Sequence, residues 1–348
     1  MRIAQVAPLF ESVPPKFYGG TERIVSYLTE DLVRRGHDVT LFASGDSETH
    51  AHLRAPCARS LRLDRECKDQ LSHHIIMVEQ VAKEASEFDI IHYHIDYLHY
   101  PTTRRTHQRH VTTLHGRLDI PDLVPLYREY REMPVISISD AQREPLEWAN
   151  WQATVYHGLP TNLYPFVAEE GSYLAFLGRI SPEKGCDRAI EIARRAGMPL
   201  KIAAKIAEGP DREYYESVIR PLLREPGVEF VGEINEREKG PFLGGARALL
   251  FPIDWPEPFG LVMIEAMACG TPILAFSRGS VPEILEEGVN AHIGGSIEDL
   301  VLGVDRIGEI DRHRCREEFE RRFSDDRMAV DYERVYRRLI EEDGPWKK

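Results

Sequence analysis

The chain has 348 residues, a net charge of −13, 42% apolar residues and 29% charged residues. That length exceeds one ordinary hydrophobic core and predicts two domains, and the composition is typical of a soluble globular protein. The acidic balance excludes nucleic acid as a favoured partner, because such binding depends on Lys and Arg that neutralise phosphates. The acidic balance also disfavours peripheral contact with a membrane surface, although it is compatible with a local basic patch.

Targeting signals and metal motifs are missing from the sequence pattern. No run reaches the roughly 18 apolar residues that a membrane span needs, and residues 1–10 do not resemble a signal peptide. We therefore expect no transmembrane segment and a cytoplasmic location. Five scattered cysteines without a C-x-x-C pair predict neither a disulfide framework nor structural zinc. Twelve of the 14 histidines precede residue 160, and His92 and His94 would share one strand face, but none has metal-motif spacing, so no metal is expected.

The first half of the chain alternates strand and helix patterns. Strand patterns occupy 2–10, 37–44, 89–94 and 110–116, and helix patterns occupy 22–36 and 78–88. Residues 134–142 have the pattern of a strand that turns into a helix. This alternation is typical of a parallel sheet. A loop rich in Pro and Gly, containing Gly19 and Gly20, precedes the first helix. Its backbone N–H groups either bind an anion or a sugar, or belong to a flexible turn.

The alternation starts afresh at residue 171. Strand patterns occupy 172–180, 199–206, 227–234, 249–253 and 271–277, and helix patterns occupy 187–197, 239–248 and 261–268. We therefore predict an α/β fold with two doubly wound, Rossmann-like domains, residues 1–165 and 171–320. Residues 324–340 have the spacing of one amphipathic helix, and 341–348 are expected to form a loose terminus.

Two glutamates, Glu257 and Glu265, lie in the stretch EPFGLVMIEAMACGTP. Turn-forming residues place Glu257 in a loop at a helix entrance, and Glu265 follows about two helical turns later, so both carboxylates can face one cleft. Apolar neighbours predict that Glu265 is buried, and a buried carboxylate needs hydrogen-bond donors. The residues alone leave open whether a neighbouring loop or a polyhydroxylated ligand supplies them.

Two cations, Arg179 and Lys184, lie in the loop GRISPEKG between a predicted strand and a predicted helix. A diphosphate suits this pair, because Arg binds bidentately, Lys supplies a point charge and the helix N-terminus is positive. Two solvated side chains are the alternative. Ligands of open parallel sheets bind beyond the carboxyl ends of the strands. Convergence with Glu257 and Glu265 at that edge therefore favours a binding site.

Taken in order, these motifs resemble the retaining glycosyltransferases of family 4, whose GT-B architecture places two Rossmann-like domains across a cleft. The resemblance covers about residues 1–290. It rests on the Gly19–Gly20 loop, TLHG around His115, VYHGLP before the second domain, GRISPEKG, and EPFGLVMIEAMACGTP.

The resemblance implies an acceptor-binding N-terminal domain and a C-terminal domain that binds a nucleotide-diphosphate sugar, with a UDP-sugar favoured and no other cofactor. Arg179 and Lys184 would hold the diphosphate in the role that a metal takes elsewhere. Glu265 would accept hydrogen bonds from the ribose, and Glu257 would contact the sugar.

Further donor-site residues are implied in the same way: the backbone of Phe259, Gly260 and Leu261, the base-binding positions Gly232 and Ile234, and, from the N-terminal domain, His115 with Gly19 and Gly20. The segment 324–340 would cross back to the N-terminal domain. The chain departs from many relatives at His157-Gly158, where they have Asn-Gly, and at AAKIAEGP, which puts Lys205 near the donor. Lys205 either contacts phosphate or caps a strand.

The implied reaction is metal-independent, same-face transfer to an unidentified hydroxyl-bearing acceptor, with no covalent nucleophile. The alternatives are a catalytically silent sugar-nucleotide-binding protein and a GT-B sugar-nucleotide epimerase. A phosphorylase of the same architecture would need a lysine that carries pyridoxal phosphate, and no segment resembles such a site. The base, the sugar and the acceptor are not specified by the sequence.

Overall fold

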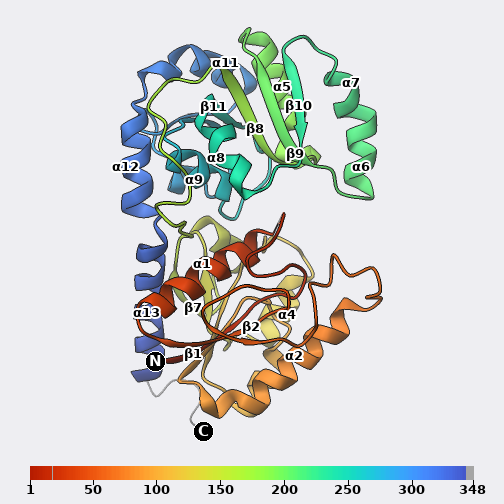
Figure 1. Cartoon of the computed structure of the whole chain (residues 1–348), viewed down its shortest axis with the longest axis vertical. Coiled ribbons are helices and arrows are strands. Elements are labelled where there is room, and N and C mark those ends of the chain that lie inside the picture. The colour runs from red at the N-terminus through yellow and green to blue at the C-terminus, as the bar shows by residue number, and fades with distance from the viewer. Residues whose placement is uncertain (18, 342–348) are drawn as a thin grey trace. The chain divides into compact units, whose positions relative to one another are not determined.

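The computed structural model describes residues 1–17 and 19–341. The chain divides into two compact units (Figure 1): unit 1 holds residues 1–158 and the segment that begins at Asp325, and unit 2 holds Leu159–Ser324. Residues 342–348, most of the expected loose terminus, lie outside the described residues, as does Tyr18 in the loop before the first helix. Each unit is built around its own parallel sheet.

The described part of unit 1 contains a sheet of seven parallel strands in the order β3-β2-β1-β4-β5-β6-β7. β1 lies between β2 and β4, and its Ile3 pairs with Val39 on one side and Ile90 on the other. The chain reverses direction across the sheet between β1 and β4, which creates a switch point at their carboxyl ends. The strands are β1 (Arg2–Val6), β2 (Asp38–Phe42), β3 (His52–Arg54), β4 (Ile90–Tyr93), β5 (His110–Thr113), β6 (Val135–Ser137) and β7 (Trp151–Thr154).

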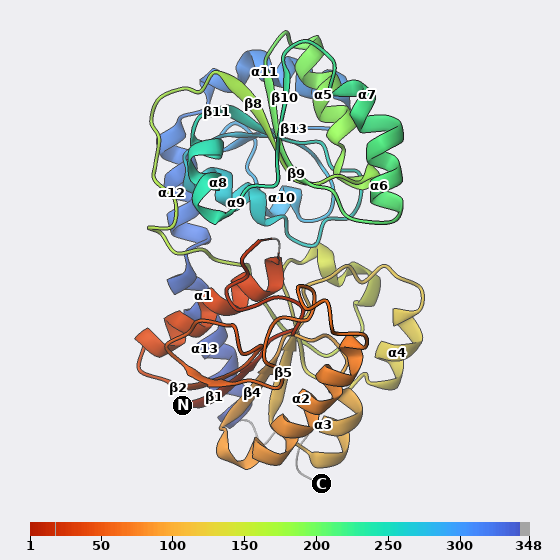
Figure 2. The ribbon, with the colours of Figure 1, turned by 45° about the vertical axis from the view of Figure 1, so that its right-hand side comes forward.

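Helices cover both faces of this sheet. α1 and α13 lie beside each other on one face, and α2 packs on the opposite face through Met77, Val78 and Val81 (Figure 2). α1 buries Ile24, Val25, Leu28 and Leu32, the spacing of one apolar stripe. The helices are α1 (Gly20–Arg34), α2 (Gln70–Glu84), α3 (Tyr100–Thr106), α4 (Leu123–Glu129) and α13 (Asp325–Glu341), with short turns η1 (Ala85–Glu87) and η2 (Ala141–Leu146).

The sheet of unit 2 has the strand order β10-β9-β8-β11-β12-β13. Its switch point therefore lies between β8 and β11, and the loops that follow these two strands are where ligands bind in such sheets. The strands are β8 (Tyr173–Arg179), β9 (Leu200–Lys205), β10 (Val228–Gly232), β11 (Ala246–Phe251), β12 (Ile273–Phe276) and β13 (Ala291–Gly294).

Unit 2 is also layered. α5 and α11 pack on one face, where Leu174, Ile190, Leu200 and Leu300 share a core, and α8, α9 and α12 pack together elsewhere on the sheet. The helices are α5 (Cys186–Arg195), α6 (Pro210–Tyr214), α7 (Arg220–Leu222), α8 (Glu236–Gly244), α9 (Leu261–Ala268), α10 (Val281–Ile284), α11 (Ile297–Arg306) and α12 (Arg312–Arg322), with η3 (Pro182–Lys184), η4 (Tyr215–Ile219) and η5 (Ile307–Glu309).

The two doubly wound sheets confirm the predicted α/β class, but several boundaries differ from the sequence patterns. β1 ends at Val6, because the apolar residues that follow, Ala7 and Leu9, are buried in a loop. The helix expected over 239–248 ends at Gly244, and Ala246 already belongs to β11. No helix in residues 1–17 and 19–341 is long and apolar enough to cross a membrane.

Candidate functional site

Lys184 and Glu257 meet at the switch point of unit 2. Lys184 follows β8 in η3, and Glu257 lies in the loop that follows β11. Lys184 Nζ is 2.6 Å from Glu257 Oε2, and the two side chains are only 19% and 10% exposed. The ion pair is therefore largely shielded from water, which strengthens it and fixes both groups in place.

A close approach between the two loops makes this pair possible. Gly185 has a φ of +74°, and a Cβ there would lie 2.4 Å from the carbonyl oxygen of Pro252. Arg188 Nε donates to that same oxygen at 2.8 Å, and the backbone N–H of Asp254 donates to the carbonyl of Glu183 at 2.8 Å. Glycine at position 185 thus allows the contact that brings Lys184 to Glu257.

Glu257 has further donors. Trp255 Nε1 donates to Glu257 Oε2 at 2.7 Å, and the ammonium of Lys184 lies 4.8 Å from the centre of the Trp255 ring, a cation–π arrangement. The backbone carbonyl of Glu257 accepts from the N–H of Ser280 at 3.0 Å. One carboxylate oxygen thus accepts both side-chain hydrogen bonds. The backbone of Glu257 is fixed separately by the loop after β12, which contains Ser280.

Arg179 ends β8 and lies beside Lys205, which ends β9. Its guanidinium donates to Glu183 Oε1 at 2.8 Å and lies 3.3 Å from Asp211 Oδ2. Arg179 is therefore oriented by two carboxylates and is not a freely solvated side chain. The strand register also brings Lys205 to the same edge, where its role in phosphate binding or strand capping stays a prediction.

Glu265 is buried in α9, as its apolar neighbours predict, and is 3% exposed. Its donor is Lys239 of α8, whose Nζ lies 2.7 Å from Glu265 Oε1 and 3.5 Å from Glu236 Oε2. Sequence reasoning missed Lys239, because nothing in the spacing of EREKGPF connects it with a glutamate 26 residues later. Glu257 and Glu265 are thus paired with two different lysines.

Gly260 forms the bend that starts α9. It has a φ of +79°, a left-handed conformation that favours glycine, so the backbone is what selects glycine at this position. Phe259 is 2% exposed, and its carbonyl accepts from Ser280 Oγ at 2.9 Å. Leu261 is the first residue of α9, and no described side chain caps the helix. The first turn of α9 therefore directly follows the Glu257 loop.

The other predicted donor-site positions of unit 2 lie farther along the same edge. Gly232 ends β10 with a φ of +91° where the register with β9 shifts, and Ile234 follows it. β9 separates β10 from β8, so these positions lie two strands from the Lys184 loop. Their assignment to the base stays a prediction.

In unit 1, Gly19 and Gly20 start α1. The backbone at Gly19 is extended, with a φ of 173°, so its conformation suits any residue. Space is the constraint, because a Cβ at Gly19 would lie 2.8 Å from Pro15 Cβ and 3.2 Å from Glu11 Cγ. Glu22 in the first turn of α1 is buried, and desolvation raises its pKa to about 7, although nearby backbone hydrogen bonds and Arg62 oppose this.

His115 follows β5 near the carboxyl edge of the sheet in unit 1. Its Nε2 lies 2.9 Å from His94 Nδ1, and its ring stacks on His157 at a centroid distance of 5.3 Å. Burial lowers the pKa of His115 to about 3, so the ring is uncharged at neutral pH. His92 and His94 share a face as expected, with ring centroids 3.9 Å apart. Residues 1–17 and 19–341 contain no group of three His, Cys, Asp or Glu that fits a metal ion.

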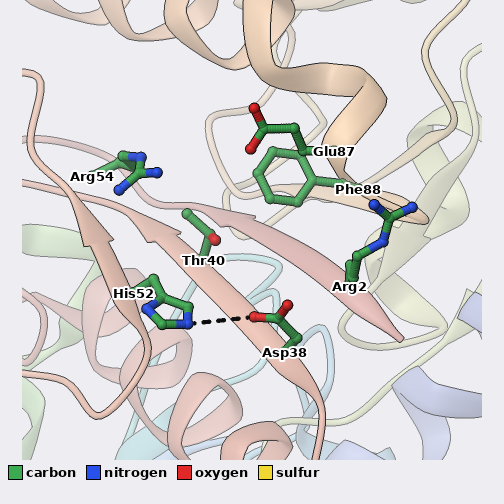
Figure 3. A pocket seen from close by; sticks show the side chains of 7 residues that line it. All are labelled: Arg2, Asp38, Thr40, His52, Arg54, Glu87 and Phe88. Carbon is green, nitrogen blue, oxygen red and sulfur yellow. Dashed lines mark ion pairs between the residues drawn. The ribbon is translucent and has the colours of Figure 1, made fainter.

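A separate hollow of about 400 Å³ lies at the opposite edge of the sheet in unit 1, beside the amino ends of β1, β2 and β3. Figure 3 shows His52 and Asp38 facing each other there, with His52 Nε2 3.5 Å from Asp38 Oδ1. None of the predicted site residues lines this hollow. Ligands of such sheets bind at the carboxyl edge, which is the other edge of this sheet. It is lined by Arg2, Asp38, Thr40, His52, Arg54, Glu87 and Phe88.

Two protein-family models match the chain. Residues 165–322 match the model described as glycosyl transferases group 1, and residues 18–152 match the model described as glycosyltransferase family 4. An uncharacterized glycosyltransferase of Methanocaldococcus jannaschii is 24% identical over 98% of this chain and 99% of its own. The alpha-maltose-1-phosphate synthase of Mycobacterium tuberculosis is 25% identical over 90% of this chain and 95% of its own.

Solved structures resemble the chain over nearly its whole length. The sucrose-phosphate synthase of Thermosynechococcus elongatus has a TM-score of 0.78 at 20% identity and covers 98% of this chain and 99% of its own. HepE of Anabaena, solved in complex with UDP and glucose, has a TM-score of 0.74 at 19% identity and covers 97% of this chain and 100% of its own. The likeness in fold therefore extends over both units.

Proposed function

We propose that this chain, which belongs to glycosyltransferase family 4 and has the GT-B fold, is a retaining enzyme that uses a nucleotide-diphosphate sugar as its donor. It transfers the sugar to a hydroxyl group of an acceptor and needs no metal ion. The observation that carries the proposal is the convergence of Lys184, Arg179 and Glu257 at the switch point of unit 2.

Arg179 and Lys184 bind the diphosphate of the donor. Both cations lie at the carboxyl edge of the sheet, and each is held by carboxylates of its own unit, Glu183 and Asp211 for Arg179 and Glu257 for Lys184. Positive charge is thus fixed where negative charge develops as the glycosidic bond to phosphate breaks. Such preorganised charge lowers the barrier because the groups need not reorganise during the reaction. Two fixed cations supply the stabilisation that a divalent ion gives in other phosphate sites.

Glu257 and Glu265 bind the hydroxyl groups of the donor. A carboxylate accepts up to four hydrogen bonds, and the side-chain contacts of Glu257 engage only Oε2. Glu265 similarly accepts a hydrogen bond from Lys239 on Oε1 alone. Each glutamate therefore keeps acceptor capacity, for the sugar at Glu257 and for the ribose at Glu265.

Glu257 is a ligand of the donor and not a covalent nucleophile. Both side-chain hydrogen bonds, from Lys184 and Trp255, fall on Oε2 and orient the carboxylate so that Oε1 can accept a hydroxyl group of the sugar, which is the role of a ligand. We therefore assign same-face attack by the acceptor hydroxyl, whose proton passes to the departing diphosphate oxygen. The bond from the sugar to phosphate breaks as the bond to the acceptor oxygen forms, and Lys184 and Arg179 neutralise the released diphosphate.

UDP is the nucleotide that we favour. The support is the fold that this chain shares with HepE of Anabaena, which was solved with UDP and glucose and with UDP-glucose. The acceptor is a molecule with a free hydroxyl group, and we assign its binding to unit 1, in which the uncharged His115 acts as a hydrogen-bonding group and not as a cation.

A donor screen tests this function. The protein is incubated with UDP-, GDP- and ADP-sugars, with and without EDTA, and released nucleotide is measured with the anomeric configuration of the product. We expect slow hydrolysis or transfer from one nucleotide class, retained configuration and no loss with EDTA. Thermal stabilisation by a nucleotide without any turnover would instead indicate a silent binding protein, and an inverted product would exclude the retaining mechanism.

A further inference from the structure

A continuous chain of buried hydrogen bonds ends at His115. It runs through one face of the sheet in unit 1 and includes two tyrosines of α13, Tyr332 and Tyr336. The three buried members contributed by the strands, Gln5, His92 and Thr113, are all 0% exposed. Buried polar groups are costly unless every hydrogen bond is matched, so a network of this kind admits few arrangements of its protons.

The donors and acceptors around Gln5 set the direction of the chain. Gln5 Oε1 lies 2.8 Å from His94 Nε2, and Gln5 Nε2 lies 3.1 Å from the hydroxyl of Tyr336. In this orientation of the Gln5 amide its oxygen accepts, so His94 Nε2 carries a proton and donates it. Burial, with the nearby histidine rings, holds the pKa of His94 well below its ordinary value, so the ring is neutral and has one proton. His94 Nδ1 is therefore an acceptor.

His115 takes its protonation from that acceptor. His115 Nε2 lies 2.9 Å from His94 Nδ1 and must donate to it. The neutral His115 ring then has no proton on Nδ1. This nitrogen is buried and has no hydrogen-bond partner among the described residues. A buried polar atom without a partner in a folded protein calls for an explanation, of which a substrate group is one.

The same orientation of the Gln5 amide sets the other end of the chain. The Tyr336 hydroxyl accepts from Gln5 and so donates to His92 Nδ1, at 2.6 Å. His92 Nε2 then carries the proton and donates to Thr113 Oγ1 at 2.7 Å, and Thr113 Oγ1 lies 3.0 Å from the hydroxyl of Tyr332. With this orientation of the Gln5 amide, every member between Tyr332 and His115 is satisfied.

We propose that Gln5 and His94 are positioning residues that hold His115 in the tautomer with a proton on Nε2 and a bare Nδ1. The bare nitrogen accepts a hydrogen bond, so the substrate group that meets it is a donor such as a sugar or acceptor hydroxyl. A carbonyl, carboxylate or phosphate oxygen does not fit there. The relevance to transfer rests on the proposed function, whereas the tautomer itself does not.

Nitrogen NMR of the full-length protein labelled with 15N-histidine tests the tautomer directly. Bare and protonated ring nitrogens differ in chemical shift and in their couplings to the ring protons, and the His115→Asn spectrum assigns the signals. We expect a protonated Nε2 and a bare Nδ1 on His115 at neutral pH. A proton on Nδ1, or a mixture of both forms, would overturn the proposal.

Two substitutions at Gln5 test the positioning role. Gln5→Met has a similar size but offers His94 no acceptor, so the proton of His115 should move to Nδ1. Turnover should then fall roughly 10- to 100-fold, because the N–H at Nδ1 of His115 would face the O–H of the substrate and neither group would accept a hydrogen bond. The stabilisation of the fold by a nucleoside diphosphate should be unchanged. Gln5→Glu keeps an acceptor and should retain the wild-type tautomer and most of the turnover. An unchanged His115 tautomer in Gln5→Met would overturn the role of Gln5.

Thr112→Val is the matched control. It removes the hydrogen bond between Thr112 Oγ1 and His99 Nε2, 2.8 Å long, which is buried in the same sheet but does not belong to the chain. Its loss of stability should be comparable, with no change in the His115 signals or in turnover. An equal fall in turnover for Thr112→Val would show that Gln5→Met acts through general instability, which contradicts the proposal. If no donor is turned over at all, the proposed function fails, and the spectra still decide the tautomer.

Discussion

Lys239 in α8 lies 2.7 Å from Glu265 in α9, and this ion pair joins the two helices at the buried end of the candidate site. The side chains are 16% and 4% exposed. Substitution of one partner in such a pair leaves the other as an uncompensated buried charge, which is costly. In the donor site that we propose, the same pair orients Glu265 toward the ribose hydroxyl groups.

Lys239→Met should therefore destabilise the protein by about 3 kcal/mol, since Glu265 loses its charged donor. A saturating nucleotide should recover part of this loss, because ribose hydroxyls donate to the orphaned carboxylate. Urea unfolding with and without nucleotide measures both effects. Lys201→Met is the control: its pair with Glu229 is 3.3 Å long and exposed, so it should cost at most about 1 kcal/mol. Equal effects of the two substitutions would argue against a special role for Lys239.

Lys184→Ala should reduce turnover on the order of 10²-fold or more, because the developing charge of the diphosphate loses a preorganised cation. The fold should survive, since Glu257 keeps the hydrogen bond from Trp255 Nε1 when the lysine is removed. Steady-state kinetics with the donor found by the screen measures the effect, and Lys201→Ala serves as the matched surface control. Unchanged turnover would show that Lys184 does not act on the phosphate.

Glu257→Gln should weaken donor positioning more than it blocks a chemical step. The amide oxygen still accepts from Trp255 or Lys184, but the negative charge beside Lys184 is lost. We expect a raised KM for the donor and a fall in kcat on the order of 10-fold, with no covalent glycosyl-enzyme in mass spectra of either protein. A glycosylated Glu257 peptide trapped from the wild type would make this residue a nucleophile.

Glu22 gives a prediction for pH. Its folded pKa of about 7 exceeds the ordinary value of 4.5, so between these values the folded state binds more protons than the unfolded state. Stability is therefore lost as the pH rises from about 4.5 to 7, by about 3 kcal/mol for this group. Glu22→Gln should gain stability relative to the wild type at pH 8 but not at pH 5, as measured by urea unfolding.

The comparison between variant and wild type is needed because other groups act in the opposite sense. Burial lowers the pKa of His110 to about 4 and that of His115 to about 3, so both groups reduce stability as the pH falls below 6.5. These contributions cancel in the difference between Glu22→Gln and wild type. A difference that is the same at pH 5 and pH 8 would contradict the raised pKa of Glu22.

Local signals predicted the elements whose ends are marked by glycine. α9 covers Leu261–Ala268, as expected, because Gly260 bends the chain before it and Gly270 follows it. The same signals placed Lys184 and Glu257 on neighbouring loops, since the carboxyl ends of parallel strands share one edge. By contrast, α2 starts eight residues before the predicted 78–88 segment, because Ile75 and Ile76 are exposed and obscure the apolar stripe.

Pairings between distant residues could not be predicted. Gln5 and Tyr336 are 331 positions apart, and only the packing of α13 on the sheet brings them together. Lys239 likewise reaches Glu265 through the contact of two helices. Periodicity and spacing describe one element at a time, so the partners of buried polar groups emerge only from tertiary structure.

The return of the chain to unit 1 at Asp325 sets an order of events during synthesis. Residues 159–324 are contiguous, so unit 2 can fold on the ribosome while unit 1 still lacks α13. Domains usually fold from the N-terminus onward as they emerge. Here the hydrogen bonds that Gln5 and His92 make to Tyr336 can form only after Tyr336 has been synthesised, more than 240 residues later. The sheet of unit 1 therefore completes these buried hydrogen bonds only after all of unit 2 has been synthesised.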